Sequence, residues 1–326
     1  MENQYEFPLL RLPCLAIQDV LGSMSPLEQI SFSMTSLRCK KLTQLFSKVA
    51  NQYEVSMFIG NEPRFDMRTF EDMYEYRMTS KQNMHMFRQW DMEEGETVFL
   101  YSEDILEDFL KWFCYVKEVF RIRIDILYYG MDKFQNRNVY IIDWLKMQTS
   151  EYYILEAYGN NVRHEDVQYL LDNVTVLGEL NLEVEMDNSQ SLHVPKWPLN
   201  LIIWKGEWIG LQQLLSFSSP LIDLSYTSLS EKDLNQFLKS WMLSKTHQGL
   251  KHSKVHIRNR QTFFQIIDGL KLEYPDEGVL ERRDLLTIAE QEGVCIQNRS
   301  GKMATIHTHF PCGNWLLNMV VEDYNF

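Results

Sequence analysis

Over most of the chain beyond residue 100, segments with the apolar spacing of a helix alternate with short strand-like segments. The strand-like segments start near residues 121, 152, 179, 199, 221 and 254, separated by roughly 20 to 33 residues. Helices are predicted between them near residues 102–113, 139–147, 164–171, 209–215, 231–241 and 261–267. Because one strand–helix unit cannot bury its own apolar face, successive units must stack. We therefore predict an α/β (mixed α and β) chain with a curved parallel sheet.

The spacing lies near the period of leucine-rich repeats, although it is irregular. Only fragments such as Leu221-Ile222-Asp223-Leu224 have the Leu-x-x-Leu-x-Leu character of such a repeat. We predict an irregular leucine-rich-repeat-like α/β domain over residues 99–290. Beyond it, strand-like segments at 294–298 and 303–309 flank a turn of Arg-Ser-Gly-Lys, and residues 316–321 suit a third strand. Residues 291–326 are therefore predicted to form a C-terminal β hairpin cap.

Residues 51–98 have a different character. Alternating apolar residues at 55–59, 65–67 and 74–78, with a Gly-Asn-Glu-Pro break at 60–63, predict a small antiparallel sheet. Residues 79–97 are charged and rich in methionine, and we interpret them as a loop or poorly ordered connector. The whole of 51–98 is predicted to be a β-rich connector.

Residues 12–46 are predicted to form three short helices. Ile17, Val20, Leu21 and Met24 make one apolar stripe. Ser25-Pro26-Leu27-Glu28 has the N-cap, the first-turn proline and the capping box of a second helix, and a basic third helix ends at Phe46. A lone domain below about 40 residues usually needs a disulfide bond, a bound metal or a partner protein to be stable. The segment has no sequence pattern for a disulfide bond or a metal site, so its apolar side chains predict a partner protein.

The segment from Phe7 to Phe46 resembles the F-box, whose hallmark is a Leu-Pro pair, here Leu12-Pro13, that opens a three-helix unit. The sequences Phe-Pro-Leu-Leu-Arg-Leu-Pro at 7–13 and Met-Ser-Pro-Leu-Glu at 24–28 are similar to the variant found in the large nematode F-box family. Residues 199–270 are similar to the type 2 F-box-associated domain (FBA_2) of those proteins. The segments 218–224 and 233–239, together with Trp241 and Leu250, carry this second resemblance.

In that family the F-box, here residues 1–50, docks on the Skp-type adaptor of a cullin–RING ubiquitin ligase, and the C-terminal region recruits the target. The resemblance therefore implies a non-enzymatic substrate-recognition subunit of an SCF-type ligase, with an unknown protein substrate. Helix-in-groove docking through apolar anchors is compatible with this role. The positions that it implies for adaptor binding are Leu10, Leu12, Pro13, Ile17, Val20, Leu21, Leu27, Ile30 and Leu37.

Two alternatives stay open, an adaptor-binding scaffold without a ligase role and a cytosolic enzyme of unrecognised type. No catalytic motif is present, and no cofactor is predicted. His307, His309 and Cys312 lack a fourth ligand at a suitable spacing, so no metal site is predicted. Trp208 is a candidate recognition anchor, whereas Trp241 is predicted to be a core residue. Arg258 and Arg260 are interpreted as parts of a solvated loop.

Net charge and cysteine content indicate which classes of partner and which cellular compartment to expect. A formal net charge of −13 disfavours binding to nucleic acid or to an anionic membrane surface. The five cysteines are widely spaced and form no Cys-x-x-Cys pair, which is typical of reduced thiols. The acidic N-terminus has no apolar signal core, and no apolar run approaches the ~20 residues that span a bilayer. We expect a cytoplasmic or nuclear protein.

Overall fold

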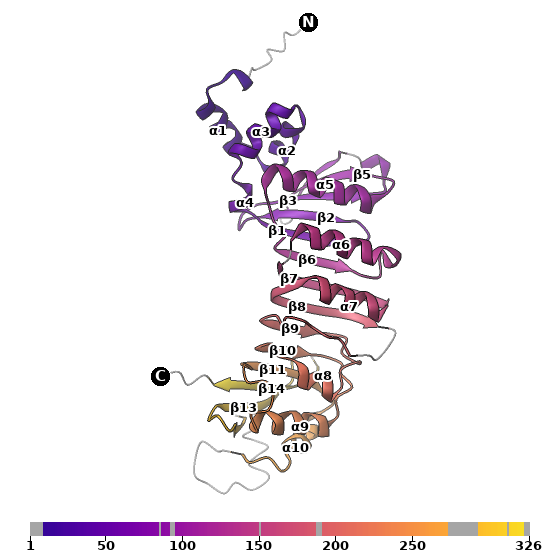
Figure 1. The fold of residues 1–326 in the computed structure, drawn as a ribbon, viewed down its shortest axis with the longest axis vertical. Helices are drawn as coiled ribbons and strands as arrows, with labels where there is room; N and C mark the ends of the chain where they lie inside the picture. Colours follow the sequence, from indigo (N-terminus) through magenta and orange to yellow (C-terminus); the bar gives the residue numbers. More distant parts are fainter. Residues whose placement is uncertain are drawn as a thin grey trace. The chain divides into compact units, whose positions relative to one another are not determined.

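The computed structural model describes residues 9–84, 86–91, 95–149, 151–186, 191–272, 293–311 and 313–322. The chain divides into two compact units, unit 1 (1–129) and unit 2 (130–326). Both units combine helices with a sheet, which confirms the predicted mixed α and β class (Figure 1). Phe7, Pro8, Cys312, residues 273–290 of the predicted repeat domain and residues 291–292 of the predicted cap lie outside the described residues.

Unit 1 begins with a group of short helices. A 3-10 turn, η1 (Leu9–Arg11), precedes α1 (Cys14–Ser23), α2 (Pro26–Met34), α3 (Leu37–Phe46) and α4 (Val49–Gln52). The predicted capping box of α2 is confirmed. The Ser25 hydroxyl accepts a hydrogen bond from the Glu28 amide at 3.3 Å, and the Glu28 carboxylate accepts one from the Ser25 amide at 2.8 Å. These two bonds satisfy amide groups that the start of a helix otherwise leaves without partners.

Replacing Ser25 with alanine is expected to lower the free energy of unfolding by about 1 kcal/mol, because the Glu28 amide loses its acceptor. Urea denaturation of the full chain measures this change. The matched control is Ser31→Ala in the same helix, where the hydroxyl donates only to the Leu27 carbonyl four residues earlier. Such a bond adds little to a helix, so the control should unfold like the parent. Equal losses from both variants would contradict the capping argument.

The strands of unit 1 follow the order β4-β5-β3-β2-β1-β6. Pairing of β1 with β2 and of β2 with β3 is antiparallel, which confirms the predicted antiparallel sheet at 53–78. β6 adds to β1, and β5 adds to β3, in parallel. The bounds are β1 Glu54–Ile59, β2 Arg64–Arg68, β3 Met73–Thr79, β4 Arg88–Asp91, β5 Gly95–Tyr101 and β6 Ile126–Gly130.

The prediction of a loop over residues 79–97 is wrong for much of its length. It contains the 3-10 turn η2 (Gln82–Met84), strand β4 and the beginning of β5. β5 pairs with β3 and β4 in register, with Thr97 opposite both Glu75 and Gln89. Such strands are difficult to predict from a polar sequence. A strand near a sheet edge is held by backbone hydrogen bonds and has only one apolar face to bury.

The predicted strand at residues 121–126 is also displaced. Helix α5 (Ile105–Phe120) continues further than expected, since Val116, Val119 and Phe120 extend its buried stripe. Arg121 then ends the helix in the left-handed conformation, with φ of 58°. Only from Ile126 does the chain enter β6. The alternation at 121–126 therefore belongs mainly to an extended connection rather than to a paired strand.

The strands of unit 2 follow the order β7-β8-β9-β10-β11-β14-β13-β12 in the sheet. β7 to β11 are parallel, whereas β14, β13 and β12 continue the sheet in antiparallel fashion, so the expected C-terminal hairpin is present. The strands are β7 Glu151–Val162, β8 Thr175–Met186, β9 Asn200–Ile203, β10 Leu221–Leu224, β11 His252–Ile257, β12 Val294–Gln297, β13 Met303–His309 and β14 Trp315–Glu322. The helical segments are η3 Gln135–Arg137, α6 Asn138–Gln148, α7 His164–Asn173, α8 Leu211–Ser216, α9 Glu231–Met242 and α10 Arg260–Ile267.

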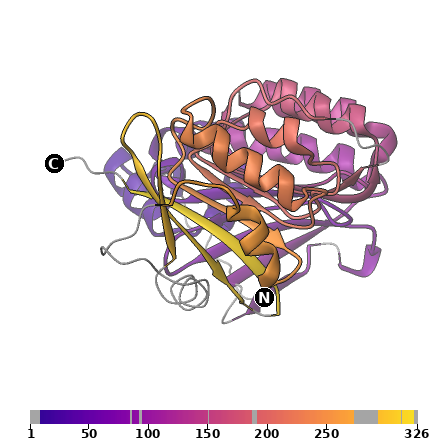
Figure 2. The same ribbon diagram turned by 90° about the horizontal axis from the view of Figure 1, so that it is seen from below.

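Helices lie against one face of the parallel part of this sheet. Figure 2 shows α7, α8 and α9 on the same side of the strands. Burial alternates accordingly, because Leu180, Leu182 and Val184 of β8 are buried while Glu183 and Glu185 between and after them are exposed. Between β8 and β9, the described residues 191–199 contain no helix, so the strand–helix alternation is irregular. Assignment to the leucine-rich repeats stays a prediction.

No helix in the described ranges has the combined length and apolarity that crossing a bilayer requires.

Candidate functional site

The inner residues of the N-terminal helices are buried within unit 1. Ile17, Leu21, Leu27 and Ile30 are each 2% exposed or less. These four positions, which the resemblance assigned to adaptor binding, therefore contribute to a small core in this structure. Ile17 and Leu21 of the apolar stripe and the Leu27–Ile30 pair point inward because a three-helix unit must bury one face of each helix, whereas Val20 and Met24 of the stripe are half-buried.

Helix α5 completes this core. α2 and α3 both pack on α5. The Ser33 and Tyr115 hydroxyls are hydrogen bonded at 2.9 Å, and the Gln44 amide donates to the Glu118 carbonyl at 3.2 Å. The forty-residue segment thus does not stand alone, because part of the cover that it needs comes from its own chain.

A second set of apolar side chains in these helices stays in contact with solvent. Leu37 at the start of α3 is 81% exposed, Leu15 of α1 is 75% exposed and Leu45 of α3 is 70% exposed. Met34 at the end of α2 is also exposed. Sequence reasoning assigned Leu37 to the adaptor but missed the other three. The spacing of Leu37 and Leu45, eight residues apart on one helix, was the signal available, since it brings them toward the same side.

The Leu-Pro turn lies beside the start of α3. The Arg38 guanidinium donates a hydrogen bond to the Leu10 carbonyl at 3.0 Å, so η1 is tied to the residue next to Leu37. Leu10, Leu12 and Val20 are half-buried, and Pro13 is exposed. The predicted positions that keep contact with solvent are therefore Leu10, Leu12, Pro13, Val20 and Leu37. Together with Leu15, Met34 and Leu45 they make up what we call the outer apolar set.

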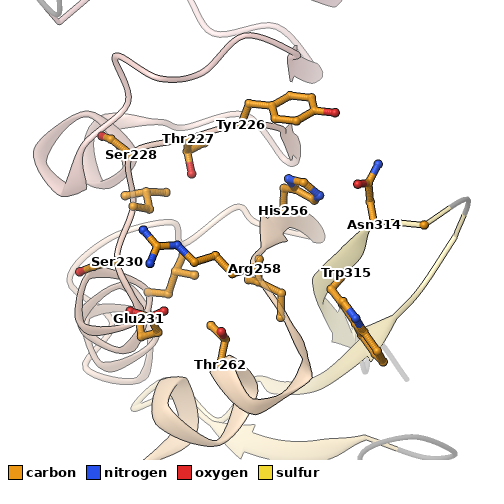
Figure 3. Close-up of a pocket in the computed structure, with 14 residues that line it drawn as sticks. Tyr226, Thr227, Ser228, Ser230, Glu231, His256, Arg258, Thr262, Asn314 and Trp315 are labelled. Atoms are coloured by element: carbon orange, nitrogen blue, oxygen red, sulfur yellow. The ribbon is translucent and has the colours of Figure 1, made fainter.

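Unit 2 carries a pocket of about 340 Å³ at the carboxyl ends of β10 and β11 (Figure 3). Its walls are residues 226–231, which lead from β10 into α9, residues 256–258 at the end of β11, and residues 313–315 at the start of β14. Antiparallel pairing of β14 with β11 places Trp315 opposite Ile257 and so closes one side. The carboxyl ends of parallel strands are where open α/β sheets usually bind ligands.

Tyr226 has an unusual backbone at the mouth of the pocket. Its φ is 51°, in the left-handed region that costs a tyrosine roughly 1–3 kcal/mol. This conformation holds the Tyr226 ring against His256, with ring centroids 5.1 Å apart and an edge-to-face angle of 65°. Arg258 is exposed in a bend after β11, which agrees with the predicted solvated loop, and it also lines the pocket, whereas Arg260 is the first residue of α10.

The other residues singled out in the sequence lie elsewhere. Trp241 is 1% exposed, which confirms the prediction that it is a core residue. Trp208 is half-buried, while Trp204 is the more exposed of the two. Within the described residues, no group of three or more His, Cys, Asp and Glu side chains is placed to hold a metal ion. Cys312 is not among those residues.

Comparison with known proteins found one family match, over about a fifth of the chain. A model of the F-box associated family (FBA_2) matches residues 188–255. The matched region contains β9, α8, β10 and α9 and ends within β11. It therefore includes the pocket wall at 226–231. The predicted similarity to this domain is confirmed, with bounds shifted toward the N-terminus. No curated protein and no solved structure has significant similarity to the chain.

Proposed function

We propose that the protein is a substrate-recognition subunit of an SCF-type (cullin–RING) ubiquitin ligase. The F-box associated match at 188–255 is the observation that carries this proposal, since such domains accompany an F-box. The outer apolar set supports it, because solvent-exposed leucines on short helices suit a groove on a partner protein.

In this role residues 9–46 dock on a Skp-type adaptor, which links the chain to a cullin, and unit 2 holds the target protein. The chain supplies no catalytic group of its own. It raises the effective concentration of the target beside the ubiquitin-loaded enzyme, and this proximity accelerates the transfer of ubiquitin to the target. We propose a cytoplasmic or nuclear location, where the adaptor and cullin are found.

Co-purification tests the proposal. The tagged full chain is expected to capture both adaptor and cullin from cell extract, whereas the Leu12→Ala/Pro13→Ala double variant should lose both. Capture of the adaptor without cullin would favour the scaffold alternative, and capture of neither would favour the enzyme alternative.

Point substitutions test adaptor docking better than a variant in which residues 1–46 are deleted. Deletion would remove the α2 and α3 contacts with α5, including the Lys40–Glu118 ion pair at 2.8 Å. The truncated chain would therefore expose apolar surface of α5, and its failure to bind the adaptor would not separate docking from misfolding.

A further inference from the structure

Hydrogen-bond donors without partners gather in the pocket of unit 2. In the described part of the chain, the Arg258 guanidinium forms no hydrogen bond and no ion pair. The Thr227 hydroxyl and the side-chain amide of Asn314 likewise form no hydrogen bond there, although the Asn314 backbone amide donates to the Pro311 carbonyl at 3.1 Å. In Figure 3, Arg258 extends across the pocket toward the 228–231 segment, and the Thr227 hydroxyl points into the same space. These donors come from three segments, beside β10, β11 and β14, that meet at this pocket.

The hydroxyl groups nearest the helix are already engaged. Ser228 donates to the Ile209 carbonyl at 2.8 Å, and Ser230 donates to the Asp233 carboxylate at 2.6 Å. The Asp233 charge is thereby used in capping α9, where the Ser230 amide also binds it at 2.9 Å. Because Asp233 is engaged at the start of α9, Arg258 stays available to a ligand as a cationic side chain of the pocket lining.

The pocket lacks the acidic excess of the chain as a whole, because its lining carries one arginine, Arg258, and one glutamate, Glu231. The net charge of the chain is −13, yet among the described residues lining the pocket the single carboxylate is Glu231, and it makes no ion pair with Arg258 within 4.0 Å. The first turns of α9 and α10 also line the pocket, through Glu231 and Thr262. The N-terminal end of a helix carries partial positive charge and favours an anion.

We propose that this pocket binds a phosphate monoester, carried as phosphoserine or phosphothreonine on the target protein. The identity of the carrier rests on the proposed function, whereas the anion site rests on the pocket alone. A guanidinium fork with hydroxyl and amide donors on other walls matches the several oxygens of a phosphate. A carboxylate would use fewer of these donors and would fill a small part of a volume of about 340 Å³. The exposed Tyr226 ring and the half-buried Trp315 flank the pocket and suit contact with neighbouring residues of an extended peptide.

Titration of the full chain with capped phosphoserine, followed by calorimetry, tests the anion site. Capped phosphoserine is expected to bind, and capped serine and capped aspartate are expected not to. Arg258→Gln should weaken binding by about tenfold or more, since a charge-assisted bond is lost. Glu231→Gln should strengthen binding by about threefold, because it removes the carboxylate that repels the ligand.

The matched control is Arg299→Gln. Arg299 is an exposed arginine whose amide bonds to Met242 at the opposite end of α9, about 18 Å along a twelve-residue helix. This variant should bind capped phosphoserine like the parent. Equal binding of capped serine, or unchanged binding by Arg258→Gln, would overturn the anion site. Inorganic phosphate that binds as tightly as capped phosphoserine would overturn the assignment to a peptide.

Adaptor capture separates this inference from the proposed function. The Arg258→Gln variant should still capture adaptor and cullin, because Arg258 is an exposed residue of unit 2. Adaptor capture without phosphoserine binding would overturn only the pocket inference. Phosphoserine binding without adaptor capture would overturn the receptor role and leave the anion site standing.

Discussion

Leu37→Asp is expected to weaken adaptor capture by at least about thirtyfold without unfolding the chain. Leu37 is 81% exposed, so little of its side chain contributes to the folded core. It is the first residue of α3, where a carboxylate interacts favourably with the helix N-terminus. The same charge would have to be buried without a partner in an apolar groove, and loss of a central anchor at an interface costs about 2 kcal/mol or more.

Purified adaptor and full-length variants allow this difference to be measured by surface plasmon resonance, with urea denaturation as the test of folding. Leu199→Asp is the matched control, because Leu199 is an exposed leucine in unit 2 and should have no contact with the adaptor. Leu27→Asp is unsuitable, since Leu27 is fully buried and its replacement would destroy the core. Adaptor affinity that is unchanged in Leu37→Asp would show that α3 does not face the partner.

Local signals in the sequence predicted the helices well. The capping box at Ser25 and Glu28 and the buried Trp241 of α9 depend on residues a few positions apart, so a single sequence contains them. β5 was missed because its pairing with β3 is a tertiary contact, and β4 was missed with it because β4 pairs with β5. The end of α5 was missed because Arg121 adopts a left-handed conformation that β-branched and bulky residues disfavour and that the sequence does not mark.

The two candidate sites differ in how far sequence reasoning reached them. Spacing and the Leu12-Pro13 pair located the N-terminal helices, but not which leucines face solvent, since that depends on α5 at residues 105–120. The pocket was not predictable. Its walls meet because β11 pairs with both β10 and β14, which brings residues 226–231 and 313–315 to the end of β11 beside Arg258.

His247 should make the folded state less stable as the pH falls below about 6.5. Its side chain is only 7% exposed and lies edge-to-face against Phe237, with ring centroids 4.9 Å apart. Burial lowers the pKa of His247 to about 4, an effect that the nearby Leu214 carbonyl opposes only in part. No hydrogen bond within the usual distance limits reaches either ring nitrogen from the described residues. A protonated imidazole would therefore be buried with little compensation.

The sign of the effect follows from the two pKa values. The unfolded chain binds a proton near pH 6.5, whereas the folded chain stays neutral at this position until about pH 4. The contribution of His247 to the free energy of unfolding is thus fully present above pH 6.5 and declines as the pH falls. Near pH 4 the folded state has lost about 3 kcal/mol of stability through this residue. His247→Asn should remove this slope, since asparagine tolerates the φ of 56° at this position and does not titrate.

The measurement is the free energy of unfolding by urea at intervals from pH 7.5 to pH 4.5, with the titration of the His247 ring followed by NMR. Subtracting the variant curve from the parent curve cancels groups common to both, including Asp66, whose pKa burial raises to about 6. His309→Asn is the control, because His309 is exposed on β13 and should leave the slope unchanged. A His247 ring that titrates near pH 6.5 in the folded chain would contradict the prediction, since burial would then cost the charged ring nothing.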